Sequence, residues 1–199
     1  MLEKDRDKAL AKIKNEVLNL PNSILCGYRR ENKYLPVIGS GSSLAKIIFI
    51  GEAPGRNEAK TGEPFCGSAG KILDELLLSV GLSRQEIYIT NIIKDRPPKN
   101  RDPLPEEIKI YGPFLDRQIE IIQPEIIVTL GRYSMDYIMR LFGLDLEIEP
   151  ISRAHGKSYE ARASYGRVKI IPLYHPAAVI YNQSLKKTLR EDFQVLKML

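Results

Sequence analysis

Three polar residues closely follow short apolar runs in the sequence: Glu52, Asn91 and His175. A carboxylate, an amide and an imidazole can together form a catalytic or binding site. A carboxylate can orient or activate water, an amide can donate and accept hydrogen bonds at once, and an imidazole can donate to a developing negative charge. Taken singly, each has a plain structural explanation as a loop carboxylate, a turn residue or a core histidine. Their meeting at one place would favour a functional site.

The elements that must position these residues are predicted by hydrophobic patterning. Apolar runs rich in β-branched residues predict buried strands at 46–50, 86–90, 125–130 and 168–173, and helical spacing predicts helices at 1–20, 69–79, 105–122, 134–142 and 184–199. Strand–helix alternation with continuously apolar strands predicts an α/β fold, a three-layer α/β/α sandwich with a central four-stranded parallel sheet. We expect a single domain over residues 1–199, with the helix of residues 1–20 packed onto it. Since parallel strands end at one edge, Glu52, Asn91 and His175 should face a common crevice.

Composition restricts the class of protein. The chain has 199 residues, a formal net charge of +5 and only two cysteines, Cys26 and Cys66, which cannot build a disulfide framework. No apolar run reaches the roughly 18 residues of a membrane span, and the charged N-terminus has no signal-peptide pattern. We therefore expect a cytoplasmic protein with no membrane partner and a mild preference for polyanions. We also expect a monomer, although no feature of the composition specifies the oligomeric state.

Motifs for nucleotides and metals are absent from the sequence. The Gly39-Ser-Gly-Ser-Ser loop lacks the third glycine of a dinucleotide fingerprint, and neither Lys60 nor Lys71 ends a proper phosphate loop. A zinc site of Cys66, His155 and His175 has no ligands at close spacing. Kinase and dehydrogenase activities thus have no motif support, and we predict no metal site.

Four blocks of the sequence resemble family 4 uracil-DNA glycosylases between about Cys26 and Asn182. They are GEAPGRNEAKTGEPFCGSAGKILDELL, YITNIIKDRPPKNRDPLPEE, IIVTLGR and IIPLYHPAAV. The resemblance implies a DNA repair hydrolase that flips uracil out of single- or double-stranded DNA and cleaves its N-glycosidic bond, leaving an abasic site for base excision repair. A related branch cross-links to that site through a loop histidine, which residues 99–103 lack, so the resemblance implies a monofunctional enzyme.

The resemblance also implies roles for individual residues at the uracil. His175 would lie at uracil O2, Glu52 beside the sugar, and Asn91 at the base edge, where one amide distinguishes uracil from cytosine. Phe65 would stack on the base. Glu58 would crowd out the methyl group of thymine; the alternative is a surface carboxylate.

Contacts to DNA are implied around the same edge of the sheet. Phosphates would be contacted from the loop after the second strand by Lys94, Arg96, Lys99 and Arg101. Ser68 would provide a second phosphate-binding position at the start of a helix. Val179 falls where the superfamily carries an apolar wedge that fills the gap left by the flipped base. Valine is short for this task, so Ile180 or Tyr181 could share it.

One departure concerns a cofactor. The resemblance implies a four-iron, four-sulfur cluster, which members of the family usually bind through four cysteines. Only Cys26 fits a ligand position here, with Arg29, Asp95 and Tyr111 at the others. We therefore expect no cofactor. We predict that Arg29 or Arg30 pairs with Asp95 and that Tyr111 packs beneath them; the alternative is a solvated Asp95 with apolar packing in the space.

Two other functions stay open on sequence alone. A protein that lost the cluster could have kept the pocket for DNA binding or base sensing with little or no turnover. A glycosylase for another deaminated base, such as hypoxanthine, would share Glu52, Asn91 and His175.

Overall fold

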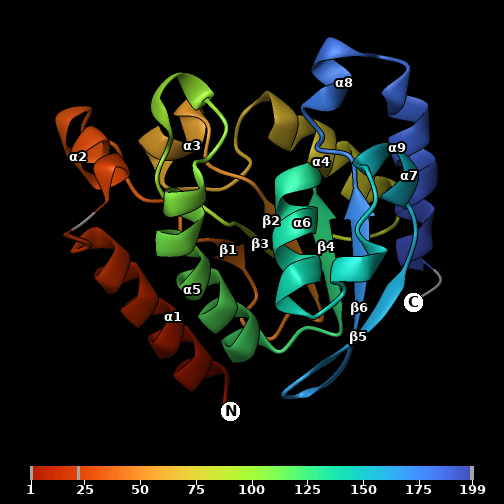
Figure 1. Cartoon of the computed structure of the whole chain (residues 1–199), viewed down its shortest axis with the longest axis horizontal. Helices are drawn as coiled ribbons and strands as arrows, with labels where there is room; N and C mark the ends of the chain where they lie inside the picture. The colour runs from red at the N-terminus through yellow and green to blue at the C-terminus, as the bar shows by residue number, and fades with distance from the viewer. Residues whose placement is uncertain (1, 22, 198–199) are drawn as a thin grey trace.

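The computed structural model describes residues 2–21 and 23–197 and shows a sheet between two layers of helices (Figure 1). The strands are β1 (Ser40–Gly41), β2 (Ile47–Gly51), β3 (Tyr88–Asn91), β4 (Ile126–Leu130), β5 (Tyr159–Ala163) and β6 (Gly166–Leu173). The α-helices are α1 (Glu3–Leu18), α2 (Ile24–Glu31), α3 (Arg56–Thr61), α4 (Ser68–Ser79), α5 (Pro105–Ile122), α6 (Arg132–Leu141), α7 (Ile151–Ala154), α8 (Ala178–Tyr181) and α9 (Leu185–Phe193). Short 3₁₀ turns are η1 (Pro98–Asn100), η2 (Asp145–Glu147) and η3 (Gln194–Lys197).

The sheet has the strand order β1-β3-β2-β4-β6-β5. Strands β3, β2, β4 and β6 are parallel to one another, whereas β1 and β5 pair antiparallel at the two edges. The predicted α/β/α fold with a central four-stranded parallel sheet is therefore confirmed, and the sheet has two further edge strands. Each of the four parallel strands begins and ends within two residues of its predicted range.

Alternation along the strands builds a core on both faces of the sheet. On β2, Ile48 and Ile50 pack into one cluster of buried side chains and Phe49 packs into the other. Ile127 and Val128 on β4 divide between the clusters in the same way. Because successive side chains of a strand point to opposite faces, an unbroken apolar run serves both layers.

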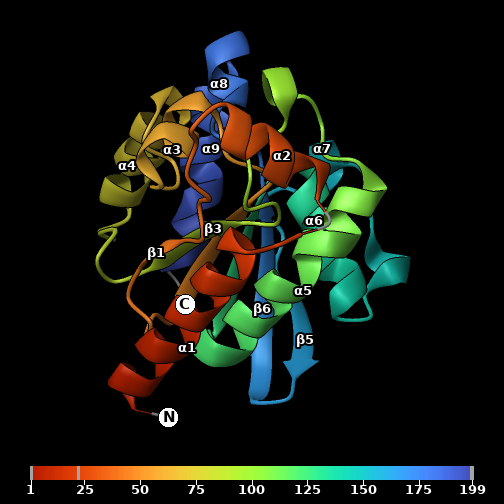
Figure 2. The same ribbon diagram turned by 90° about the vertical axis from the view of Figure 1, so that its left-hand side faces the viewer.

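The helices divide between the two faces, as Figure 2 shows with the sheet seen nearly edge-on. The cluster that contains Ile48 is covered by α1, α2, α5 and α6, and the cluster that contains Phe49 by α4, α8 and α9. Ile13 and Val17 of α1 are fully buried, and Arg6 Nη1 donates to the Ile122 carbonyl at the end of α5 at 2.6 Å. The N-terminal helix thus packs onto the sheet domain through α5.

Three of the predicted helices differ in extent by two residues or more. The helix predicted at 134–142 is α6, which begins at Arg132 and ends at Leu141. The helix predicted at 184–199 is α9 followed by η3, and residues 198–199 lie outside the described residues. The helix predicted at 1–20 spans Glu3–Leu18, and residue 1 also lies outside the described residues. In the described part of the chain, no helix combines the length and apolarity that crossing a membrane requires.

Candidate active site

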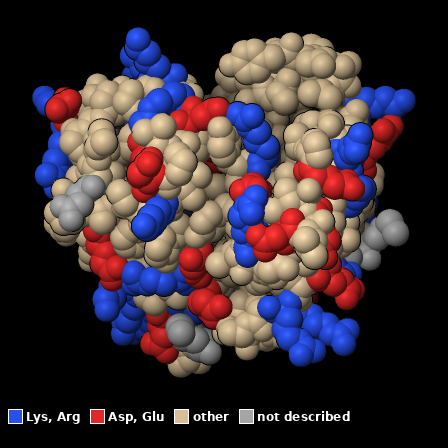
Figure 3. Space-filling model, in the orientation of Figure 1, with Lys and Arg blue, Asp and Glu red and all other residues tan. Residues whose placement is uncertain are grey.

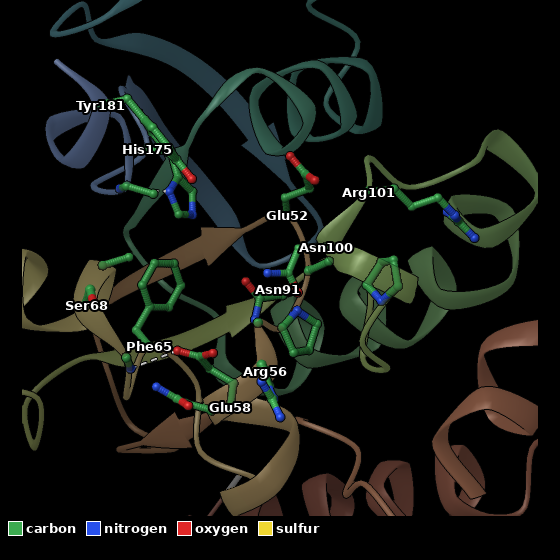
Figure 4. A pocket seen from close by; sticks show the side chains of 18 residues that line it. Glu52, Arg56, Glu58, Phe65, Ser68, Asn91, Asn100, Arg101, His175 and Tyr181 are labelled. Carbon is green, nitrogen blue, oxygen red and sulfur yellow. Dashed lines mark hydrogen bonds between the residues drawn. The ribbon is translucent and has the colours of Figure 1, made fainter. Parts of the chain in front are cut away.

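A cavity of about 450 Å³ lies at the carboxyl ends of β2, β3 and β6, the edge at which the sequence placed a crevice (Figure 4). The predicted residues that line it are Glu52, Glu58, Phe65, Ser68, Asn91, Arg101 and His175. The walls also include Arg56, Asn57 and Asn100, for which the sequence predicted no role. Polar groups from three parallel strand ends therefore do share one concave site.

Glu52 is the first residue after β2, and its side chain is half-buried. The pKa of its carboxyl is raised to about 7, mainly by burial and also by the nearby charge of Asp102, while Arg132 acts in the opposite direction. Asp102 in turn receives hydrogen bonds from Arg132 Nη2 at 2.7 Å and from the Tyr133 hydroxyl at 2.8 Å. A carboxyl with this pKa changes its charge near neutral pH, which suits a group that acts on water.

Asn91 is the last residue of β3 and is almost fully buried at the cavity floor. It pairs in parallel register with Gly51 of β2. A Cβ atom on Gly51 would lie 2.3 Å from Asn91 Oδ1 and 2.8 Å from Phe65 Cζ. Glycine at this strand end is therefore what lets the amide and the aromatic ring approach each other.

Phe65 and His175 form the aromatic side of the cavity. Their ring centroids are 5.5 Å apart with an interplanar angle of 28°. Phe65 is only 5% exposed and adopts a positive φ of 50°, which is rare for a bulky residue. Figure 4 shows the Phe65 ring and the His175 imidazole turned toward the same space as Asn91. A flat, planar ligand would fit against this side.

His175 is positioned by its own turn. The Ala177 backbone N–H donates to His175 Nδ1 at 3.1 Å, so the neutral ring carries its proton on Nε2. Burial lowers the pKa of the imidazole to about 4, which keeps the ring neutral at physiological pH. A Cβ on Gly131, whose φ is +97°, would approach His175 Cβ to 3.3 Å. The site therefore holds a neutral N–H donor in a fixed place.

Glu58 lies in the cavity wall on α3 and also fixes a loop. Its Oε1 accepts a hydrogen bond from the Gly67 backbone N–H at 2.9 Å, just before α4 begins. The carboxylate thus links the segment after β2 to the start of α4, where Ser68 is the first helical residue. This is a local structural contact within the wall that the sequence did not indicate.

The prediction that Lys94 contacts DNA phosphates is wrong, because its side chain is fully buried and cannot reach DNA. Its Nζ donates to Thr90 Oγ1 at 2.8 Å, to the Asn91 carbonyl at 2.6 Å and to Gln118 Oε1 at 2.5 Å. Burial lowers the pKa of this amine well below its ordinary value, and Asp116 opposes the effect. A lysine after a strand is usually solvated, but here three acceptors replace water.

The other basic residues of this segment do lie toward the surface. Arg96 donates to Asn100 Oδ1 at 2.7 Å and its guanidinium lies 5.5 Å from the ring centre of Tyr34. Lys99 is exposed on η1. Arg101 lines the cavity while its two Nη atoms donate to the Glu107 carboxylate at 2.9 and 2.6 Å. Protein contacts therefore hold two of the three cations in place beside the cavity.

The prediction that Val179 is the apolar wedge is also wrong. This residue of α8 is 2% exposed and its side chain packs into the core. Its neighbour Tyr181 is 90% exposed and lines the cavity, and Ile180 is 45% exposed. Residues 174–184 carry no Lys, Arg, Asp or Glu. Figure 3 shows the region of α8 as an uncharged lobe at the upper right, beside a hollow in the surface. Tyr181 is thus the side chain that projects where a wedge was expected.

The predicted Arg29–Asp95 pair is present and buried, which confirms that expectation. Arg29 Nε lies 3.5 Å from Asp95 Oδ1, with side chains 5% and 0% exposed. Tyr111 is also fully buried, and its hydroxyl donates to Asp95 Oδ2 at 2.6 Å. Burial raises the pKa of Asp95 to about 6 although Tyr111 and Arg29 act against that rise. Tyr111 therefore bonds directly to the carboxylate rather than only packing beneath the pair.

These side chains do not fit a four-cysteine cluster. Cys26 is the single thiol among them, and its Sγ lies 3.1 Å from Arg29 Nη2. The same Nη2 donates to the Leu18 carbonyl at 2.9 Å, which ties α2 to the end of α1. A guanidinium, a carboxylate in an ion pair and a phenol thus occupy the other positions with contacts of their own. Among the described residues, no three His, Cys, Asp or Glu side chains are grouped to hold a metal ion.

Comparisons with known proteins identify a family model that matches most of the chain and several similar proteins. The family model of the uracil DNA glycosylase superfamily matches residues 38–197. A type-4 uracil-DNA glycosylase of Archaeoglobus fulgidus is 49% identical over 84% of this chain and 82% of its own length. That of Sulfurisphaera tokodaii is 45% identical over 96% of this chain and 84% of its own length. That of Thermotoga maritima is 39% identical over 83% of each chain.

Proposed function

Because this chain belongs to the uracil-DNA glycosylase superfamily, we propose that it excises uracil from deaminated DNA as a monofunctional hydrolase. The observation that best supports the proposal is the convergence of Glu52, Asn91 and His175 on one cavity beside Phe65. A base must leave the helix to reach these groups, which is the route that enzymes acting on bases generally take. The product is DNA with an abasic site.

Recognition of the base is assigned to the cavity floor and its aromatic side. The Asn91 amide can donate to uracil O4 and accept from N3–H, whereas cytosine presents the opposite pattern at both atoms. The Phe65 ring offers a stacking surface to the pyrimidine. Glu58 in the wall would crowd the 5-methyl group of thymine. Together these contacts select uracil by hydrogen bonding and by size.

The chemistry then follows from the charges that develop. The bond between sugar C1′ and uracil N1 breaks, its electron pair leaves with the base, and positive charge builds on the sugar. The neutral His175 N–H donates toward uracil O2 and stabilises the departing anion. The Glu52 carboxylate offsets the positive charge and orients a water molecule whose oxygen adds to C1′. The water's proton passes to Glu52 or to solvent.

Binding of the DNA backbone is assigned to the surface around the cavity. Arg96, Lys99 and Arg101 supply positive charge after β3, and Ser68 begins α4 on the side of the cavity opposite Arg101 (Figure 4). Phosphate contacts of this kind make affinity fall as salt concentration rises. Tyr181 takes the part of the wedge that enters the gap left by the flipped base, because Val179 is held in the core.

We further propose that the protein works without an iron–sulfur cluster, as a monomer in the cytoplasm. The buried contacts of Asp95 with Arg29 and Tyr111 join the segment before β1 to the loop after β3 and to α5. A cluster bound at these ligand positions would tie the same three segments through metal bonds. Purified protein should accordingly lack the visible absorption of an iron–sulfur centre.

Strand scission tests the proposed function. Oligonucleotides with one uracil, both single-stranded and paired with guanine, are incubated with the protein and then cleaved by alkali at abasic sites. Matched oligonucleotides with cytosine, thymine or hypoxanthine at the same position serve as controls. We expect scission at uracil. Scission at hypoxanthine alone would assign another substrate, and no scission with any base would leave a DNA-binding protein without turnover.

A further inference from the structure

Phe65 lies in a backbone conformation that needs external support. Its φ of 50° belongs to the left-handed region, which bulky residues adopt only where the surroundings enforce it. The ring nevertheless has to lie over Gly51 and beside His175, where it forms one side of the cavity. The contacts that stabilise this conformation therefore also determine where the stacking surface is.

The support comes from Arg84, a residue of the loop between α4 and β3. Its Nη2 donates to the Phe65 carbonyl at 2.5 Å and its Nη1 donates to the Pro64 carbonyl at 3.1 Å. Two adjacent carbonyls are thus held by one planar guanidinium, whose fork-shaped set of donors a lysine cannot reproduce. The peptide units on both sides of Phe65 are therefore fixed from outside the cavity.

Arg84 is itself held on two sides. Its Nε donates to Asp74 Oδ1 on α4 at 2.5 Å, and the two side chains are 33% and 52% exposed. The Ser83 hydroxyl and backbone N–H donate to Glu86 Oε2 at 2.7 and 3.0 Å, which stiffens the loop that carries Arg84. The guanidinium is therefore oriented before any ligand arrives.

A glycine in α4 leaves room for this arrangement. A Cβ on Gly70 would lie 1.7 Å from the Phe65 carbonyl oxygen and 3.2 Å from Arg84 Nη2. The first turn of α4, the Phe65 carbonyl and the guanidinium thus meet at a point that only a residue without a side chain can line. The conformation of Phe65 therefore depends on contacts made by α4 and by the loop that follows it.

We propose that Arg84 is a positioning residue for base excision, which holds Phe65 as the stacking surface for uracil with Asp74 as its anchor. Arg84 does not line the cavity, so it acts on the base only through Phe65. The proposal rests on the proposed function. It predicts that replacing Arg84 impairs excision only while the Phe65 ring is present.

A double-mutant cycle tests the proposal on single-turnover uracil release from an oligonucleotide with one uracil. Arg84→Met should slow release about tenfold without loss of the folded state, since small misplacements of binding groups have effects of this size. In a Phe65→Ala background the same substitution should slow release by less than about twofold. Asp74→Asn, a milder change at a half-exposed position, should slow release about threefold and lose its effect in that background too.

Arg140→Met is the matched control, because Arg140 also pairs with carboxylates, Asp136 and Asp145, but lies on α6 outside the cavity. It should leave uracil release unchanged in both backgrounds. Equal losses from Arg84→Met, or from Asp74→Asn, with and without the Phe65 ring would overturn the proposal, as would wild-type rates in both variants. A wild-type protein that releases no uracil would instead refute the proposed function itself.

Discussion

The ionisation of Glu52 should control the rate of excision across the physiological pH range. Burial raises the pKa of this carboxyl to about 7, so about a tenth of the molecules carry the carboxylate at pH 6 and about nine tenths at pH 8. If the carboxylate is the active form, single-turnover release should rise about tenfold between these two pH values. His175 does not interfere, because the pKa of its ring is about 4.

Two neighbouring charges allow the direction of this effect to be tested. Arg132→Gln removes the cation that lowers the pKa of Glu52 and also removes the ion-pair partner of Asp102, so the inflection of the pH profile should move upward. Asp102→Asn removes an anion that raises the pKa, so the inflection should move downward. Both side chains are largely exposed, and shifts of about half a pH unit are expected for charges screened by water.

The assay is the rate of uracil release at saturating enzyme, measured from pH 5 to pH 9 for the wild type and both variants. Melting temperatures measured at each pH separate changes in rate from changes in folding. Shifts of the two variants in the same direction would refute the electrostatic argument. A wild-type rate that shows no inflection between pH 5 and pH 9, as expected for the ordinary glutamate pKa of about 4.3, would refute the assignment of the carboxylate itself.

Three further predictions concern specificity, DNA and stability. Asn91→Asp should gain measurable release of cytosine, detected on cytosine oligonucleotides, because a carboxyl can present the complementary hydrogen-bond pattern; no release would refute that readout. Tyr181→Ala should slow excision from duplex DNA by about fivefold or more and from single strands much less, since only a duplex leaves a gap to fill; equal slowing on both would contradict the wedge. Asp95→Ala should lower the unfolding free energy in urea by about 3 kcal/mol at pH 7.5, because it leaves the Arg29 charge buried and unpaired; an unchanged denaturation midpoint would show that the pair contributes nothing.

The central strands could be predicted because both of their faces are buried. A run such as residues 126–130 packs its side chains into two cores and must be apolar throughout. The edge strands lack this signal. In β1 only Ser40 and Gly41 pair, and in β5 the exposed Glu160 and Arg162 alternate with half-buried residues, so neither forms a continuous apolar run.

Site residues could be predicted where side-chain chemistry carries the role. Glu52, Asn91 and His175 stand at or just after the carboxyl ends of three parallel strands, and the topology alone brings their positions together. The Arg29–Asp95 pair could be predicted because opposite charges stand at two positions where the family resemblance implies cluster ligands. Opposite charges at two positions that are expected to be neighbours can be recognised from the sequence alone.

Other roles leave no pattern in the sequence. Lys94 is held by two side-chain oxygens and a backbone carbonyl, and only the fold shows that these acceptors surround it. Arg84 donates hydrogen bonds to two backbone carbonyls. Since every residue has a carbonyl, the sequence contains no pattern that predicts this contact. The choice between Val179 and Tyr181 depends on how α8 turns relative to the core. These features follow from tertiary packing.

Release of free uracil by the wild type, Asn91→Ala and His175→Ala tests the central claim most directly. Single-turnover rates are measured on a uracil oligonucleotide with detection of the free base, and DNA affinity is measured in parallel at the same salt concentration. The wild type should release uracil, and each variant should lose about tenfold or more in rate while its DNA affinity changes by less than about twofold, because phosphates dominate binding. A wild type that frees no uracil, or a variant that keeps the wild-type rate, would contradict the account.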